Sequence, residues 1–100
     1  MAAHKVANIS ELNEGECKTY TVEGQSIAVF NVGGKFTAID DTCAHRGGSL
    51  GSGTLEGDIV TCPLHGWQYD VTTGECKMNP QVTLKSFEVK VDGDSLVLEV

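Results

Sequence analysis

The sequence contains no long hydrophobic run. No segment approaches the roughly 18–20 consecutive apolar residues that a membrane-spanning helix needs, and residues 1–6 hold no apolar stretch of the kind found in signal peptides. We therefore expect a soluble, cytoplasmic protein that does not act at a membrane. With 100 residues, the chain has room for one domain, at residues 1–100, and for one modest core.

Basic residues are also scarce. Seven lysines and arginines stand against fourteen aspartates and glutamates, so the net charge is -7. Nucleic acids and anionic membrane surfaces would repel such a chain. The acidity has two interpretations that the sequence leaves open. It attracts a partner with a basic docking face in short-lived encounters, or it only keeps the domain soluble.

Helical periodicity is missing as well. No window of ten or more residues repeats its apolar positions with the 3.6-residue period of a helix. Residues 10–14 are expected to form one helical turn, with Ser10 as its N-cap. Twelve glycines against six aromatic residues favour a small fold rich in turns.

Short segments instead alternate hydrophobic and polar residues, as strands do. Glycine-containing turns are expected at residues 23–25, 31–35 and 92–94, where they would form hairpins. The expected strands are residues 17–22, 27–32, 36–39, 59–61, 68–70, 86–91 and 95–100. The predicted fold class is all-β, an antiparallel sandwich or open barrel.

The composition changes between residues 40 and 74, where glycines gather and two Cys–His pairs occur. This stretch is predicted to be a loop-built subdomain that carries the function. A base β domain would consist of residues 1–39 and 75–100.

The two pairs are Cys43 with His45, and Cys62 with His65. Each pair places a soft thiolate and an imidazole close together on a glycine-bearing loop. Two loops that each offer one sulfur and one nitrogen can close around a metal centre.

Four kinds of site could use these residues. A disulfide framework would leave both histidines without a role, and a cytosolic chain does not favour it. A catalytic Cys–His nucleophile needs only one pair. Structural zinc accepts two cysteines and two histidines, but its paired ligands usually have two to four intervening residues, whereas Cys43 and His45 have one. The fourth is an iron–sulfur cluster with mixed ligands.

The spacing resembles that of the Rieske family. The pattern is C-x-H, then sixteen residues, then C-P-x-H-G-W, and it runs from Cys43 to Trp67. The likeness continues through the Asp-Val-Thr-Thr-Gly turn at residues 70–74 and the two closing strands. By this resemblance the chain is a soluble, low-potential Rieske-type ferredoxin similar to those of aromatic-ring dioxygenases, with residues 40–74 as the cluster-binding subdomain.

The resemblance implies one [2Fe-2S] cluster per chain. Cys43 and Cys62 would bind one iron, and His45 and His65 the other, which would lie nearest to solvent. With neutral imidazoles the oxidised cluster carries a charge of about zero, against about -2 for an all-cysteine cluster. Adding an electron therefore costs less, and the reduction potential falls in the range of about -150 to +300 mV.

Neighbouring residues are expected to tune that potential. Gly47, Gly48 and Gly66 would let backbone N–H groups approach the sulfides, although ordinary turn chemistry also explains them. Tyr69 matches a tyrosine that donates a hydrogen bond to a cysteine sulfur in the high-potential members. The extra cysteines and the serine of those members are missing here. Fewer hydrogen bonds to sulfur imply a potential at the low end of the range.

Four further residues have more than one interpretation. Trp67 is expected to pack under the second loop rather than to form a docking rim. Arg46 would form a salt bridge within the loops or contact a partner. Cys17 and Cys76 lie outside the motif and are expected to be small buried hydrophobic residues.

The resemblance implies an electron-transfer component and not an enzyme in its own right. An oxygenase needs a second iron site with two histidines and a carboxylate, and only His4 remains after the cluster ligands. The function we favour is a monomeric one-electron carrier that forms transient complexes, between a flavin-dependent ferredoxin reductase and a terminal oxygenase or reductase. The alternative is a Rieske-like small subunit of an assimilatory nitrite reductase. A redox sensor or a structural zinc domain is more distant.

Overall fold

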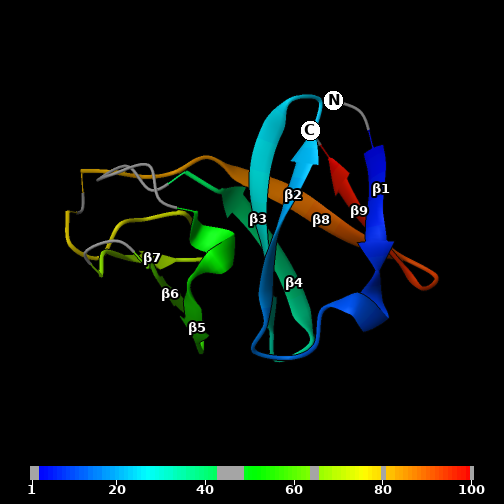
Figure 1. Cartoon of the computed structure of the whole chain (residues 1–100), viewed down its shortest axis with the longest axis horizontal. Coiled ribbons are helices and arrows are strands. Elements are labelled where there is room, and N and C mark those ends of the chain that lie inside the picture. The colour runs from blue at the N-terminus through cyan, green and yellow to red at the C-terminus, as the bar shows by residue number, and fades with distance from the viewer. Residues whose placement is uncertain (1–2, 43–48, 64–65, 80, 100) are drawn as a thin grey trace.

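The computed structural model describes residues 3–42, 49–63, 66–79 and 81–99. Its strands form two antiparallel sheets (Figure 1). The larger sheet has six strands in the order β1-β9-β8-β4-β3-β2, and the smaller has three in the order β5-β6-β7. The strands of the larger sheet are β1 (Ala3–Asn8), β2 (Cys17–Val22), β3 (Gln25–Val32), β4 (Lys35–Asp40), β8 (Ser86–Asp92) and β9 (Ser95–Glu99). Those of the smaller sheet are β5 (Thr54–Glu56), β6 (Ile59–Thr61) and β7 (Gln68–Asp70).

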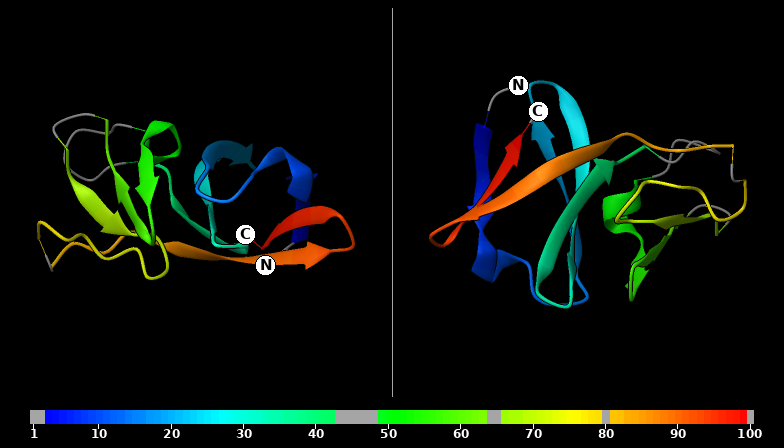
Figure 2. Two further views of the ribbon diagram at one scale, coloured as in Figure 1. Left: turned by 90° about the horizontal axis from the view of Figure 1, so that it is seen from below. Right: turned by 180° about the vertical axis from the view of Figure 1, so that it is seen from behind.

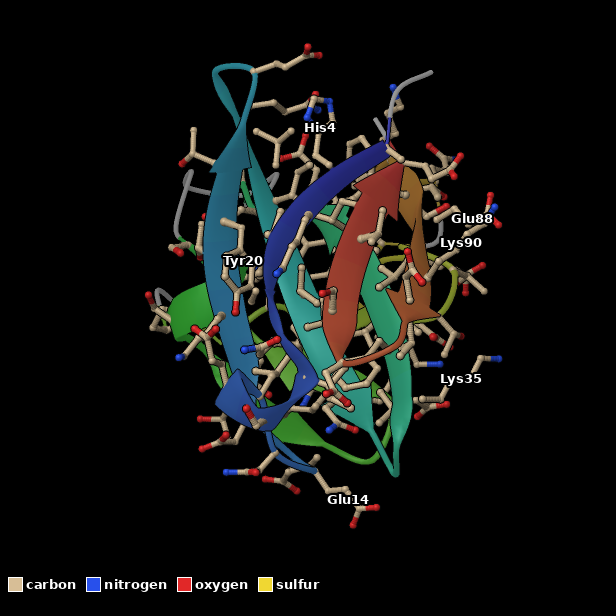
Figure 3. All side chains as sticks on the ribbon, turned by 90° about the vertical axis from the view of Figure 1, so that its right-hand side faces the viewer. His4, Glu14, Tyr20, Lys35, Glu88 and Lys90 are labelled. Atoms are coloured by element: carbon tan, nitrogen blue, oxygen red, sulfur yellow. The ribbon has the colours of Figure 1, made fainter. Side chains whose placement is uncertain are left out.

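The larger sheet curls until its two edge strands, β1 and β2, contact each other. Figure 3 looks onto this seam, with β2, β1 and β9 side by side. Two short 3-10 helices, η1 (Ile9–Glu11) and η2 (Leu50–Ser52), accompany the strands. The expected all-β fold is confirmed as a nearly closed antiparallel sheet with a smaller sheet at one end (Figure 2). Within the described ranges, no helix has the length and apolar character needed to cross a membrane.

Tight turns set the register of the larger sheet. Glu23 and Gly24 link β2 to β3, and Gly33 and Gly34 link β3 to β4. All four have positive φ, from 51° to 95°. Two-residue turns with positive φ at both positions match the twist of neighbouring strands, and glycine adopts this conformation without strain. The hairpins expected at these glycines are confirmed.

Strand β3 contributes to two separate cores. Ile27 and Val29 lie in the core shared by the six strands of the larger sheet. Ala28 and Phe30 lie in a second core, formed with the smaller sheet and the segment that follows it. Because side chains alternate between the two faces of a strand, one strand forms a wall of both cores. Strand β3 thereby holds the two sheets together.

The first helical turn begins earlier than expected. The sequence predicted a turn over residues 10–14 capped by Ser10, but η1 begins at Ile9 and its N-cap is Asn8. The backbone N–H of Asn8 donates to the Glu11 carboxylate at 2.9 Å. Glu11 thus satisfies the N–H group at the start of the turn, as a residue three positions into a helix commonly does, and the prediction for Ser10 was wrong.

Two strands were not predicted. Strand β1 pairs with β9, but its register shifts between Lys5 and Ala7. At this bulge the consecutive apolar residues Val6 and Ala7 both pack in or against the core of the larger sheet, so the alternation that marks a strand is broken. Strand β5 (Thr54–Glu56) is a three-residue strand with a single half-buried residue, Leu55, between two exposed ones.

Gly74 closes the turn after β7. Its N–H donates to the Asp70 carbonyl at 2.7 Å, and its carbonyl accepts from the Leu84 N–H at 2.8 Å. Its φ is +86°, and a Cβ atom built on it would lie 2.2 Å from the Leu84 carbonyl oxygen. The close approach of residues 75–84 to the smaller sheet therefore depends on a residue without a side chain.

Gly74→Ala should lower the free energy of unfolding by about 2–4 kcal/mol, because it adds a steric clash to an unfavourable φ. Gly57→Ala is the matched control. Gly57 has a φ of +62° but open space around its Cβ position, so its cost should be about 1 kcal/mol. Urea denaturation followed by Trp67 fluorescence measures both. Equal losses would show that the contact with Leu84 is unimportant.

Candidate metal centre

The first predicted ligand loop begins and ends at paired backbone positions. Thr42 and Ser49 form an antiparallel bridge, and the Leu50 N–H donates to the Asp41 carbonyl at 2.8 Å. Residues 43–48 run between these two stems. The predicted site residues Cys43, His45, Arg46, Gly47 and Gly48 lie on this loop, outside the described residues.

The second predicted ligand loop starts at Cys62, directly after β6. The Cys62 N–H donates to the Trp67 carbonyl at 2.7 Å, which brings the two ends of the loop together. Gly66 is exposed and has a φ of +73°, so a side chain at this position would strain the backbone. His65, the fourth predicted ligand, lies outside the described part of the chain.

Both loops are anchored on the same buried cluster. Leu50, which follows the first loop, packs in the core that also contains Cys62 and Tyr69. This core lies between the smaller sheet and strands β3 and β4 of the larger one, and η2 lies beside the smaller sheet (Figures 1 and 2). The fold therefore brings together the ends of two loops that are separated in sequence, as a shared metal centre requires.

Cys62 is the predicted ligand that the structure describes, and it is 1% exposed. Thiolates are soft ligands that suit zinc and iron–sulfur centres. A sulfur in an apolar cluster, next to a loop that carries an imidazole, fits a metal-bound role. The described donor and the positions of the loop ends are thus compatible with a cluster held by two cysteines and two histidines.

Tyr69 and Trp67 both pack in or against the core that contains Cys62. Tyr69 is fully buried in β7, pairs with Val60 of β6 and belongs to the same core as Cys62. Trp67 is half-buried and packs against that core, which agrees with the packing role expected for it.

Cys17 and Cys76 are free thiols and not a disulfide. Cys76 is buried in the core of the smaller sheet, and Cys17 packs against that core from β2. The Cys17 thiol also donates to the Gly53 carbonyl, with Sγ and O 3.5 Å apart. Burial raises the pKa of Cys17, and the charges of Asp41 and Glu16 raise it further. Cys17 is therefore a protonated donor that contacts the chain just after η2.

One polar residue at this site was missed by the sequence analysis. Asp41 immediately precedes the stem of the first loop and is buried, at 6% exposure. Its carboxylate accepts hydrogen bonds from Thr19, Ser49 and Gly51. Nothing in the local sequence distinguishes it from Asp40, and only the burial of its side chain does.

Comparison with known proteins gives one consistent family. Residues 2–88 match the Rieske [2Fe-2S] domain family. The ferredoxin component of biphenyl 2,3-dioxygenase from Rhodococcus jostii (strain RHA1) is 39% identical over 101 residues, which cover 100% of this chain and 94% of that protein.

Solved structures give the same fold. A chain from a complex of reduced oxygenase and oxidised ferredoxin in carbazole 1,9a-dioxygenase superposes with a TM-score of 0.89 and 36% identity, covering 96% of this chain and 91% of that one. A structure assigned as the small subunit of an NADPH nitrite reductase has a TM-score of 0.85 over 100% of both chains, but 20% identity. At that identity the second likeness concerns the fold alone.

The raised pKa of Cys17 predicts slow alkylation in the native protein. At pH 8 its reaction with iodoacetamide should be about tenfold slower or more than in the urea-unfolded chain, because less thiolate is present and the thiol is half-buried. Mass spectrometry of the labelled peptide measures the rate, with Cys17→Ser as the blank. Because the folded state favours the protonated thiol, Cys17 contributes to the free energy of unfolding. This contribution is complete below the unfolded pKa of about 8.5 and is lost as the pH rises through the folded pKa. Equal native and unfolded rates would contradict this environment.

Proposed function

This chain belongs to the Rieske [2Fe-2S] domain family, and we propose that it is the ferredoxin component of a ring-hydroxylating dioxygenase system. It is an electron carrier with one [2Fe-2S] cluster per chain, and it is not itself an enzyme. The observation that carries the proposal is the full-length similarity to a dioxygenase ferredoxin component. The likeness to the nitrite reductase subunit extends to the fold alone and makes that alternative weaker.

We propose that Cys43 and Cys62 bind one iron of the cluster, and that His45 and His65 bind the other. The closed stems of both loops and the burial of Cys62 in their common core support this assignment. The loop-built subdomain, residues 40–74, would hold the cluster on the base formed by residues 1–39 and 75–100.

When bound, such a cluster accepts and releases one electron at a time. The residues around it determine how easily it does so. Tyr69, buried beside Cys62, is proposed to donate a hydrogen bond to a cysteine sulfur, and Gly47, Gly48 and Gly66 to let backbone N–H groups approach the sulfides. Trp67 would cover the second loop, and Arg46 would form a salt bridge or contact a partner. This set of groups supports a potential near the low end of the Rieske range, at about -150 mV.

The partners we propose are a flavin-dependent ferredoxin reductase and a terminal oxygenase. The net charge of -7 favours brief encounters with basic docking faces. Cys17 and Cys76 are free thiols, which suits the reducing cytoplasm, where we propose that the carrier acts.

The cluster can be tested by electron paramagnetic resonance of the dithionite-reduced protein. We expect two irons per chain and a two-iron signal with the low average g value of mixed histidine and cysteine ligation. His65→Cys should keep a cluster but lower its midpoint potential by about 100 mV or more, because a thiolate adds negative charge. His4→Cys is the matched control, since His4 lies on β1, paired with Leu98 of β9, and should leave the potential unchanged.

An unchanged potential in His65→Cys would refute His65 as a ligand. Zinc in the elemental analysis without a paramagnetic signal would instead indicate a structural metal domain, and the electron-transfer function would be refuted.

The carrier role can be tested by stopped-flow mixing of the reduced protein with a purified ring-hydroxylating oxygenase and its aromatic substrate. We expect rapid reoxidation, with a rate that falls several-fold between about 50 and 500 mM salt as the acidic surface is screened. Reoxidation by dissolved oxygen alone is the control. Failure to reduce any dioxygenase, together with recovery from its own cells in a stable complex with a nitrite reductase, would support the alternative.

A further inference from the structure

Asp41 is an acidic residue in a position where a charge is costly. The residue is 6% exposed, and carboxylates are rarely buried unless hydrogen bonds or opposite charges compensate the lost hydration. The Thr19 hydroxyl donates to Oδ1 at 2.7 Å, and the Gly51 N–H donates to the same oxygen at 2.8 Å. The Ser49 hydroxyl lies 2.9 Å from Oδ2 and 3.1 Å from Oδ1. The carboxylate thus accepts hydrogen bonds from three donors, at 2.7–2.9 Å.

Asp41 and its three donors come from three different places in the chain. Thr19 lies in the middle of β2, Asp41 precedes the first loop, and Ser49 and Gly51 follow it. We call these four residues the Asp41 clamp. The main chain reinforces it, because the Asp41 N–H donates to the Ser26 carbonyl at 3.2 Å and the Asp41 carbonyl accepts from Leu50. One carboxylate therefore joins both stems of the loop to each other and to the larger sheet.

The segment that follows the loop, residues 49–53, packs closely against β2. A Cβ atom at residue 51 would lie 2.0 Å from Thr19 Oγ1 and 2.7 Å from the Thr19 backbone nitrogen. Only glycine permits this approach, and the approach allows the Gly51 N–H to reach the carboxylate. Two residues further along, the Gly53 carbonyl accepts from Cys17. The stem is thus attached to β2 at two successive points.

We propose that Asp41 is a positioning residue for the cluster: by clamping both stems of the loop formed by residues 43–48 to β2, it preorganises Cys43 and His45 for iron. This inference rests on the proposed function. Ordering a loop costs conformational entropy, and a clamp that orders the stems before the metal binds removes part of that cost from binding. Groups that orient metal ligands in this indirect way typically change metal affinity 10–100-fold when they are removed.

Variants of the holo-protein can separate positioning from general stability. Asp41→Ala removes the acceptor of all three donors, and Asp41→Asn retains one acceptor oxygen. Thr19→Val and Ser49→Ala each remove a single donor at an exposed or half-buried position, so both should fold even if Asp41→Ala does not. The readouts are the rate of iron release to an excess of chelator, the line width of the paramagnetic signal of the reduced protein, and the urea denaturation midpoint.

Two controls match these variants. Asp40→Asn removes one negative charge from the neighbouring residue, whose Oδ1 accepts from the Thr42 N–H at 2.9 Å, a local bond that does not cross the loop. Leu98→Ala creates a cavity in the core of the larger sheet, and it should lower the urea midpoint without touching the loop.

We expect Asp41→Ala to release iron about tenfold faster or more and to broaden the signal, because the ligands sample several arrangements. Asp41→Asn should partly rescue both properties, and Thr19→Val and Ser49→Ala should show smaller effects in the same direction. Leu98→Ala and Asp40→Asn should keep the wild-type line width, and their release rates should change no more than their stability predicts.

The opposite result is that the iron-release rates of the Asp41, Thr19 and Ser49 variants depend on the urea midpoint in the same way as that of Leu98→Ala, with unchanged line widths. Asp41 would then only stabilise the fold, and the inference would be overturned. In that case the wild-type cluster and the proposed function stand. A wild-type chain without a two-iron cluster would overturn the proposed function, and this inference with it.

Discussion

The burial of β3 on both faces is the constraint on which the rest of the structure depends. Ile27 and Val29 complete the core of the larger sheet, while Ala28 and Phe30 complete the core beneath the smaller one. A strand that is apolar on both faces cannot expose either of them, so both sheets must cover it. The smaller sheet is thereby fixed against the larger one, and the loops that it carries are held in place.

The two predicted ligand loops use that common core in different ways. The second loop is attached through burial, because Cys62 starts the loop from inside the apolar cluster. The first loop is attached mainly through polar contacts in the part that the structure describes, since its stems meet at the Asp41 carboxylate and Leu50 packs in the core. Apolar packing tolerates small displacements of the packed side chains. Hydrogen bonds of 2.7–2.9 Å instead fix the distance and direction between donor and acceptor.

Electrostatics shapes this protein at two scales. The overall charge of -7 affects which partners approach, through a field that salt screens over about 10 Å. Inside the molecule, neutral hydroxyl and amide donors surround the buried Asp41, so that its charge is stabilised by dipoles in fixed positions. In the proposed carrier the first effect would govern encounter rates with partner proteins, whereas the second fixes the local geometry around Asp41.

Sequence alone predicted most of the strands, the glycine turns and the two candidate ligand loops. These features depend on strand alternation, positive φ and ligand spacing, which are local properties of the chain. The sequence-based prediction misplaced the cap at Ser10 and missed β1, where the bulge after Lys5 hides the alternation. It also missed Asp41, which is indistinguishable from Asp40 until the fold brings Thr19 to it from 22 positions away. Only the tertiary structure decides which of two adjacent aspartates is buried, because burial depends on what other strands place around a side chain.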